Sequence, residues 1–477
     1  MTYVDTPTMP VPTGDGSVRQ GLLMAPVLRL FAITWAMATL FHVWVSQNSF
    51  RVLYSPDWKG IVHVGLTVAA LVVLCRPRVL PLLGLAVLQI YSAWVEMPVL
   101  GNHWLLASIV ALGLLLSVAA VRTLDPAEIA RVFLPVGRVV LIVFYSFAAL
   151  SKLNQGFFTP SGSCAPFYAN ESLSSFGLPT LGHSGLPPWG AILGTVAVEC
   201  SIPVLLAFRR TRHAGVLAGL LFHSLIALDR THLFTDFSAV LLALFLLFLP
   251  ESFAGRLGER AWPKRAVAAF AVAALLVSLA LWMWPVTWLK GAGQLLWVLY
   301  DVVVIGSVVA FLWRSRDRSA TGLLRIRPLW LAAVPALALA NGLTPYLELK
   351  TSFGWNMYSN LVTVAGHTNH LLIPRTWPVT DAQSHLITVI GSDDPGLEGY
   401  AADRYRLALP QVQYYAAAHP RAWLRYELDG TVRTAPHIGS DPVLSRHVPV
   451  WRHKLEIFRA VDMRTPVRCQ DLWGPAN

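Results

Sequence analysis

A single lysine ends an apolar run about a third of the way along the chain. In the stretch FYSFAALSKLNQGFF (residues 144–158), Lys152 is the only charged residue. A lysine at the end of a membrane helix often extends its amine to the lipid headgroups. A lysine held among apolar groups instead loses its proton more readily and can act as a general base. The stretch therefore supports two hypotheses, an interfacial anchor or a functional amine.

Two further stretches place imidazole and carboxylate groups at the ends of apolar runs. The turn WVEMPVLGNHW contains Glu96, Asn102 and His103. The segment FHSLIALDRTHLFTDF contains His223, Asp229, His232 and Asp236. Ionisable groups at membrane depth are costly and suggest function by default, although a lone histidine in a turn more often only forms hydrogen bonds. We also expect Glu199, inside the apolar run 188–207, to have a partner on a facing helix.

A third stretch, GWNMYSNLVTVAGHTNHLLIP (354–374), is rich in aromatic and amide side chains. His367 and His370 lie three residues apart in it, but no neighbouring residue supplies a third metal ligand at helical or hairpin spacing. We predict no metal site. The chain also has no phosphate-binding glycine loop, CxxC motif, nucleophile elbow or dinucleotide fingerprint, which argues against nucleotide-driven or flavin chemistry.

Membrane helices must position these side chains. The chain has 477 residues, of which 55% are hydrophobic and only 13% are charged, outside the range of soluble domains. Its apolar runs approach the roughly 20 residues that cross a bilayer as a helix, and they are too long for barrel strands. About eleven spans are predicted, at 22–45, 59–75, 79–99, 103–121, 132–151, 188–207, 213–229, 232–249, 266–286, 291–313 and 326–342.

Basic residues in the loops predict the orientation. They are concentrated in every second loop, near 76–78, 122–131, 209–212, 256–265 and 314–327, whereas the alternate loops hold only Arg51, Lys59, Lys152, Arg230 and Lys290. The positive-inside rule makes the basic loops cytoplasmic and Lys152 extracytoplasmic. The net charge of +11 follows from this pattern, so no nucleic-acid partner is expected.

The chain is thus predicted to be an integral membrane protein, in the plasma membrane if it is bacterial. Residues 1–20 do not resemble a signal peptide and are expected to form a disordered cytoplasmic tail. Residues 21–342 form the all-α polytopic membrane domain, and residues 343–477 form a small extracytoplasmic domain that is α+β or β-rich. In the latter, 385–391 and 425–434 are predicted strands, the second with a hairpin turn at Asp429-Gly430. The segment from Trp451 fits either a short helix or a strand.

Two cysteines, Cys164 and Cys469, fall on the predicted outer side. An oxidising compartment permits a disulfide between them. Two unpaired thiols far apart are equally compatible with the sequence, because it does not give their separation.

Four segments, GNHWLL, AALSKLNQG, FHSLIALDRTHLFTDFSAVLLA and SFGWNMYSNLVTVAGHTNH, resemble stretches of the vitamin K-dependent gamma-glutamyl carboxylase family. The corresponding family patterns are N-N-H-S-Y-L, A-G-x-K-K-L-D, F-H-x-M-N-S-x-x-F-S-I-G-M-F-S-Y and Y-S-W-D-M-M-V-H-S-R-S-H-Q-H. The wider group with this helical core is the horizontally transferred transmembrane (HTTM) domain proteins. In this resemblance Lys152 matches the catalytic base and His103 matches a second functional residue.

The resemblance implies a carboxylase-like enzyme. In the family, the lysine deprotonates a reduced naphthoquinone of the vitamin K or menaquinone type, and O2 adds to it. The strong base that results removes a proton from a glutamate side chain, coupled to epoxidation of the hydroquinone, and CO2 traps the carbanion. The implied partners are the lipid bilayer, a lipid quinone, and a protein or peptide substrate outside the membrane. Further candidates for the substrate and quinone pocket are Asn102, His223, Tyr145, Trp355, Asn356, His367 and His370.

The alternative function is a non-enzymatic membrane scaffold or a small-molecule transporter. A transporter is expected to have repeat-related broken spans near the midplane, and the sequence has no convincing repeat. Geometry separates the two hypotheses: a common cavity lined by Lys152, His103 and His223 favours the enzyme, and its absence favours the scaffold.

Overall fold

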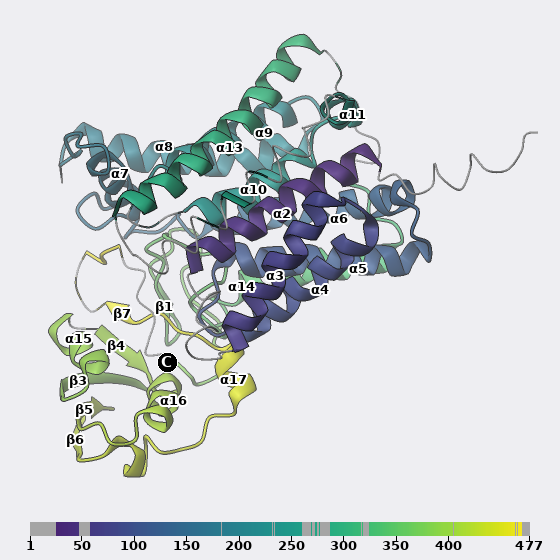
Figure 1. Cartoon of the computed structure of the whole chain (residues 1–477). Helices are drawn as coiled ribbons and strands as arrows, with labels where there is room; N and C mark the ends of the chain where they lie inside the picture. Colours follow the sequence, from purple (N-terminus) through teal and green to yellow (C-terminus); the bar gives the residue numbers. More distant parts are fainter. Residues whose placement is uncertain are drawn as a thin grey trace, which may run out of the picture.

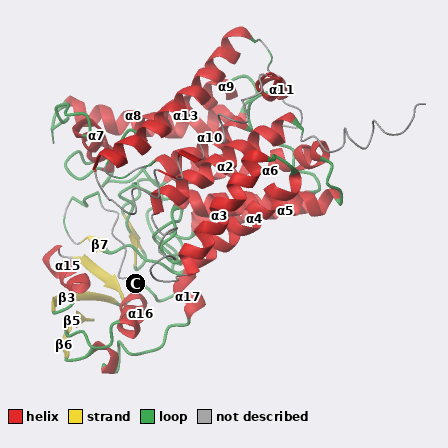
Figure 2. Cartoon of the chain, viewed as in Figure 1, coloured by secondary structure: helices red, strands yellow, loops and turns green. Residues whose placement is uncertain are grey.

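The structure is a mostly helical membrane domain with a small C-terminal sheet (Figures 1 and 2). This computed structural model describes residues 25–46 and 58–469 except 183, 231, 233, most of 260–286, 316, 318–323, 404, 463 and 465. Its membrane-domain helices are α2 (Pro26–Ser46), α3 (Trp58–Cys75), α4 (Val79–Glu96), α5 (Asn102–Val121), α6 (Pro126–Leu150), α7 (Cys164–Ser174), α8 (Leu186–Ala207), α9 (Arg212–Ile226), α10 (Thr235–Leu246), α11 (Glu251–Glu259), α13 (Thr287–Arg314), the 3-10 turn η2 (Leu329–Ala332) and α14 (Ala333–Leu343).

Seven helices in the described part of the chain are long and apolar enough to cross a membrane, as in an integral membrane protein. They are α2, α3, α4, α5, α6, α8 and the Gln294–Arg314 part of α13, and each coincides with a predicted span. Three other predicted spans have a different form. Helix α9 has only 15 residues, α10 and α11 form one apolar pair bent by 114°, and Leu329–Leu343 is a shorter apolar helix. The span predicted at 266–286 and the tail at 1–20 lie outside the described residues.

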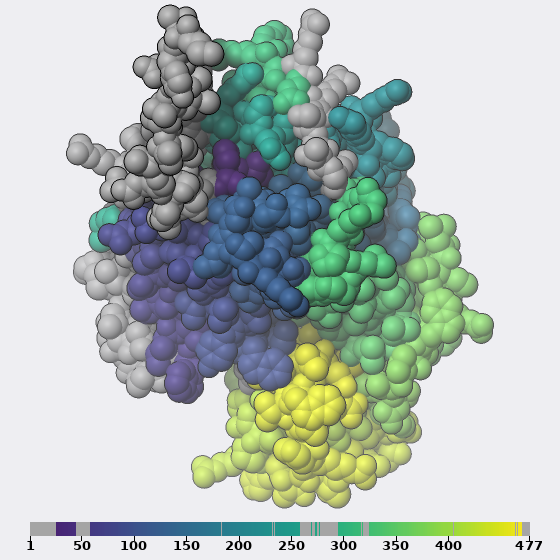
Figure 3. All heavy atoms as spheres, turned by 90° about the vertical axis from the view of Figure 1, so that its right-hand side faces the viewer, coloured from purple at the N-terminus to yellow at the C-terminus, as the bar shows by residue number. Residues whose placement is uncertain are grey.

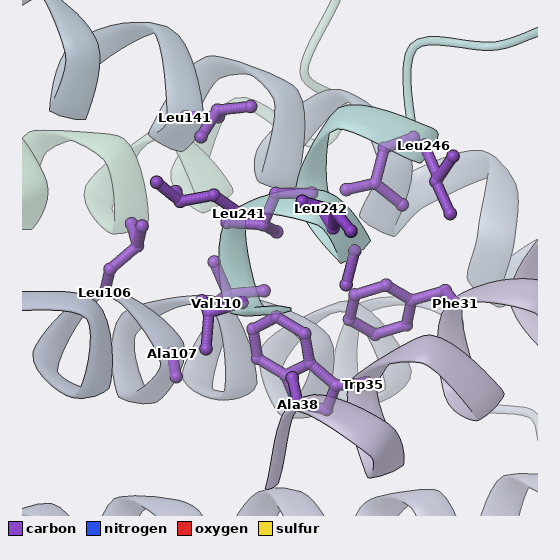
Figure 4. Close-up of a cluster of buried hydrophobic side chains, with 14 of the residues drawn as sticks. Phe31, Trp35, Ala38, Leu106, Ala107, Val110, Leu141, Leu241, Leu242 and Leu246 are labelled. Carbon is purple, nitrogen blue, oxygen red and sulfur yellow. The ribbon is translucent and has the colours of Figure 1, made fainter. Parts of the chain in front are cut away.

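Helix α10 lies at the centre of the membrane domain. It packs against α2, α5, α6 and α9, and every residue from Ser238 to Leu246 is buried. Figure 4 shows Leu241 and Leu242 of α10 among Trp35 of α2 and Val110 of α5. A helix that is hydrophobic on all sides is stable only when other helices surround it, which explains why so short a segment lies in the core. The span predicted at 232–249 is not one straight helix, because the chain bends by 114° between α10 and α11.

Helices α9 and α10 approach closely at a glycine. A Cβ added to Gly219 would overlap the ring of Phe245. That ring is fully buried and lies against Tyr145 and His223, with ring centroids 5.5 and 6.1 Å away. It therefore has no free space into which it can move. Small residues at helix interfaces allow this kind of close backbone packing in membranes.

Replacing Gly219 with alanine is expected to destabilise the protein by about 1–3 kcal/mol, the usual cost of overpacking. The melting temperature of the purified protein in detergent measures this effect. The control is Gly194→Ala on α8, where an added Cβ meets nothing within 4 Å. Both substitutions gain the same helix propensity of about 1 kcal/mol, so equal melting temperatures would contradict the packing explanation.

The C-terminal part forms a five-stranded antiparallel sheet with the order β6-β5-β3-β4-β7. Its elements are β3 (Leu386–Ser392), α15 (Pro395–Asp403), β4 (Tyr405–Ala408), α16 (Leu409–Ala418), β5 (Leu424–Leu428), β6 (Thr431–Ala435), η3 (Ile438–Ser440), α17 (Val450–Leu455) and β7 (Val461–Asp462). The predicted strands at 385–391 and 425–434 are confirmed. Asp429 and Gly430 form the hairpin turn with positive φ angles, and Trp451 lies in a helix. The sheet has its own hydrophobic core, separate from that of the membrane helices.

Residues 344–385 connect the helices to the sheet, and the first part of this segment packs into the membrane domain. Tyr346, Trp355 and Leu361 belong to the hydrophobic core of the helices, and the short pair β1 (Thr363–Val364) and β2 (His367–Thr368) follows. Figure 3 shows the C-terminal residues, in yellow and light green, gathered at one end of the helical part. The segment therefore brings main-chain groups to the helix ends where Lys152 and His103 lie.

Candidate functional site

Lys152 is buried, with only 5% of its surface exposed. Asp125 caps the start of helix α6, because its side chain accepts a hydrogen bond from the N–H of Ala127. The helix ends at Leu150, so Lys152 follows directly after its last turn. The Lys152 amine donates hydrogen bonds to the carbonyl oxygens of Ala148 (3.3 Å) and Met357 (3.4 Å). It does not extend to the surface. The hypothesis of a headgroup anchor therefore does not fit this structure.

Glu199 of α8 is the ionic partner of Lys152. The Lys152 Nζ and Glu199 Oε2 atoms are 2.7 Å apart, and the two side chains are 6% and 10% exposed. The predicted partner for Glu199 on a facing helix is confirmed. A charge buried without a partner is strongly unfavourable, so each of these groups needs the other in order to be buried.

A cavity of about 510 Å³ lies beside this pair, between α6, α7, α8 and α9. Lys152, Glu199, His223 and Tyr145 are among the polar residues that line it, and most of the other lining side chains are apolar. Some lining residues are also exposed on the outside of the protein, with exposures of 56% for Phe176, 52% for Leu178 and 64% for Leu225. The mouth of the cavity is thus apolar, which suits a ligand that enters from the lipid.

His223 lies at the inner wall of the cavity. Its Nε2 atom contacts the hydroxyl of Tyr145, and its ring packs against Phe237 with centroids 5.0 Å apart. The Ser238 hydroxyl donates to the His223 carbonyl oxygen over 3.0 Å. His223 and Tyr145 therefore line the same cavity as Lys152.

His103 lines a second pocket of about 260 Å³, which it shares with Asn102, His232, Asp236 and Arg459. The two pockets are neighbours, because four residues line both of them: Phe234, Phe237, Met357 and Tyr358. The structure thus brings Lys152 and His223 into one cavity and places His103 on the other side of this shared wall. Neither of these two pockets is lined by all three residues.

His103 belongs to a buried network of imidazoles and carboxylates. Its Nε2 atom is 3.0 Å from Asp236 Oδ2 and 3.4 Å from His42 Nδ1. The other nitrogen of His42 is 3.4 Å from Glu96 Oε1, and His63 Nε2 is 2.9 Å from the same oxygen. His42 and His63 were not among the functional residues predicted from the sequence. A histidine inside a span is the signal that could have found them, because ionisable groups at that depth are costly.

The segment after α14 stabilises the site through residues that do not line the pockets. The Asn102 side chain accepts a hydrogen bond from the Trp355 backbone N–H (3.1 Å), and the Trp355 indole donates to the Ala338 carbonyl oxygen (2.7 Å). Asn356 accepts from the Gly354 N–H and donates to the Thr351 carbonyl oxygen. These residues position the chain around Met357, and Asn102 also lines the second pocket. Trp355 and Asn356 line neither pocket.

His370 holds the end of α6 in place. Its Nε2 donates to the Leu150 carbonyl oxygen (2.9 Å), while the N–H groups of Leu372 and Ile373 donate to its Nδ1 (3.0 and 3.2 Å). An imidazole that accepts at one nitrogen and donates at the other is neutral. Burial lowers the pKa of His370, and its hydrogen bond to Leu150 opposes that shift. His367 is exposed on β2 and lines neither pocket.

Cys164 and Cys469 form a disulfide. Cys164 is the first residue of α7 and lines the cavity. The bond therefore attaches the C-terminal segment to a wall of the Lys152 cavity. The alternative of two unpaired thiols does not fit the structure.

Comparisons of the chain with family models, curated proteins and solved structures give no match. The geometry of the pockets and the resemblance of the four short segments are therefore the basis for any statement about function.

The contribution of the Lys152–Glu199 ion pair to stability can be tested by substitution. In Lys152→Met the carboxylate stays buried without its partner, a change that typically costs about 3–5 kcal/mol. The double variant Lys152→Met/Glu199→Gln removes both charges and should recover much of this loss. Melting temperatures of the wild type, both single variants and the double variant measure the coupling, and strictly additive effects would contradict it.

His370 predicts a pH dependence of stability. Because its pKa is lower in the folded protein than the ordinary value of about 6.5, protons favour the unfolded chain. Its contribution is intact above pH of about 6.5 and is lost as the pH falls below that value. Melting temperatures measured across this range should therefore fall less in His370→Gln than in the wild type. His367→Gln is the control, and it should keep the wild-type pH dependence.

Proposed function

We propose that the Lys152–Glu199 pair is the acid–base unit of a carboxylase-like membrane enzyme that deprotonates a reduced lipid naphthoquinone. The observation that carries the proposal is a buried amine–carboxylate pair in the wall of an apolar cavity. Such a cavity suits a ligand with one polar, aromatic end and an apolar tail. The resemblance to the carboxylase family assigns Lys152 the same role.

Lys152 can act as a base only when it is neutral. Glu199 provides a carboxylate 2.7 Å away that can hold the lysine proton, and such a transfer leaves no isolated charge in the apolar surroundings. The neutral amine then accepts the proton of a hydroquinone hydroxyl. O2 is the co-substrate that accepts the electrons of the resulting hydroquinone anion.

His103 acts in this scheme from the second pocket. That pocket also contains Asn102 and Arg459, groups that suit a carboxylate. Under the family resemblance, it would receive the glutamate side chain or CO2. The two pockets share four lining residues, so the lipid-soluble substrate and the polar one would lie next to each other.

The positive-inside rule, applied to the basic loops, supports an extracytoplasmic position for this site. The disulfide between Cys164 and Cys469 supports that orientation, because disulfides persist in oxidising compartments. In this proposed orientation the N-terminus is cytoplasmic and the C-terminal sheet is extracytoplasmic, and the membrane is the plasma membrane if the protein is bacterial.

A second candidate function is lipid binding without turnover, as in a membrane scaffold. The location of His103 in a pocket separate from Lys152 and His223 favours it. In this case the apolar cavity holds a lipid, and the charge pair has only a structural role. Transport has less support, because the bent pair of α10 and α11 resembles a broken span but has no repeat-related counterpart in the described part of the chain.

The activity test uses the double variant Lys152→Met/Glu199→Gln, in which no unpaired charge remains. Wild-type protein in nanodiscs should consume O2 with a reduced naphthoquinone. The double variant should lose this activity by about 100-fold or more, the usual contribution of a general base. An oxygen electrode measures the rate, and quenching of the protein fluorescence by the quinone measures binding.

Lys454→Met is the matched control. This lysine donates to the carbonyl oxygens of Trp94 and Met97 and does not line the cavity, so its substitution should leave the rate unchanged. A wild-type rate in the double variant would contradict the proposal. Binding of the quinone without any O2 consumption by the wild type would instead support the lipid-binding function.

A further inference from the structure

The network around His103 contains three side chains whose ligand atoms converge from three helices. His42 Nδ1 comes from α2, His103 Nε2 from α5 and Asp236 Oδ2 from α10. The three distances between these atoms are 3.0, 3.4 and 3.7 Å. In a tetrahedral site with metal–ligand distances of about 2.0–2.2 Å, neighbouring ligand atoms are about 3.3–3.6 Å apart. The three atoms therefore lie close to three corners of such a tetrahedron.

The second nitrogen of His42 has the partner that a metal-binding histidine needs. His42 Nε2 is 3.4 Å from Glu96 Oε1. That oxygen also contacts His63 Nε2 (2.9 Å) and the Ser92 hydroxyl, which hold it in place. A carboxylate that accepts the N–H of a metal-bound histidine fixes the tautomer and orients the other nitrogen. Here it leaves the Nδ1 lone pair of His42 directed to the side of His103 and Asp236.

The fourth position has access to the second pocket. His103 and Asp236 both line this space of about 260 Å³, whereas His42 and Glu96 do not. A site with three protein ligands and one open position is typical of reactive zinc centres rather than structural ones. Arg459 lines the same pocket, so an exogenous ligand at the open position is expected to be an oxygen anion such as a carboxylate.

We propose that His42, His103 and Asp236 bind a divalent metal ion of the Zn²⁺ class, with Glu96 as the hydrogen-bonding partner of His42. Two imidazoles and one carboxylate suit zinc better than calcium or magnesium, which prefer all-oxygen sites. The ion would join α2, α5 and α10 and would present its open position to the second pocket. This proposal does not depend on the function proposed for Lys152.

Two other arrangements would use the same residues. A metal could instead bind His42, His63 and Glu96, whose ligand atoms also lie close together. The network could also be stabilised without a metal, by protonated imidazoles that form ion pairs with the carboxylates of Glu96 and Asp236. The first alternative needs His63 but neither His103 nor Asp236, and the second needs no metal.

The metal content of the purified protein tests the proposal. The full chain is purified in detergent, incubated with ZnSO4, passed through a desalting column and measured by inductively coupled plasma mass spectrometry. About one zinc ion per chain is expected for a single three-ligand site. Loading with Co²⁺ should give the strong visible absorption of a four-coordinate cobalt site. Zinc should also raise the melting temperature of the wild type, because it binds the folded state.

Four variants distinguish the arrangements. His103→Ala and Asp236→Asn should lose the bound metal and the zinc-dependent rise in melting temperature. Glu96→Gln should keep the site but weaken zinc binding by about 10–100-fold, as for other outer partners of metal-bound histidines. His232→Ala is the matched control from the same pocket, since its side chain pairs with Asp229 (2.8 Å) and should keep the metal.

His63→Ala decides between the two triads. Under the proposal, the His63→Ala variant should retain zinc and the cobalt spectrum. If His63→Ala lost both while Asp236→Asn kept them, the metal would be bound by His42, His63 and Glu96, and the proposal would be wrong. Wild-type protein that binds neither zinc nor cobalt would overturn it too, in favour of a proton-linked network. The double variant Lys152→Met/Glu199→Gln should still bind zinc, because neither residue belongs to the metal site. Zinc binding therefore tests the metal site separately from the proposed enzymatic activity.

Discussion

The ion pair between Lys152 and Glu199 is the interaction on which the arrangement around the cavity depends. It joins the end of α6 to the middle of α8 in a buried part of the protein. Each group is unfavourable there alone, so these two helices must keep one relative position. The apolar side chains around the pair can then form a cavity of defined shape without leaving a charge unpaired.

The segment after α14 completes this arrangement. The Met357 carbonyl accepts a hydrogen bond from the Lys152 amine, and His370 binds the last carbonyl of α6. Met357 and Tyr358 also form part of the wall between the two pockets. Residues that lie more than 200 positions after Lys152 thus determine its surroundings, and this explains why an irregular segment packs so deeply against the helix ends.

The sequence predicts the helices well where local composition determines the structure. Continuous apolar runs marked the seven long spans, and Asp429-Gly430 marked the hairpin. The sequence suggested one cavity for Lys152, His103 and His223, but only Lys152 and His223 line the same pocket, and His103 lines the neighbouring one. The partner of Lys152 and the wall between the pockets depend on how α6, α8 and α10 pack. His42 and His63 were missed because each is a single polar residue in an apolar run, and only the fold shows that they meet Glu96.

The disulfide between Cys164 and Cys469 spans 305 residues. It converts everything between α7 and the C-terminal segment into one covalent loop that contains α8, α9, α10 and the sheet. This loop can close only after its last cysteine has been synthesised and has reached the compartment of the first. The disulfide beside the Lys152 cavity therefore forms only after the C-terminal sheet has been synthesised, and a chain in the process of insertion holds an incomplete site until then.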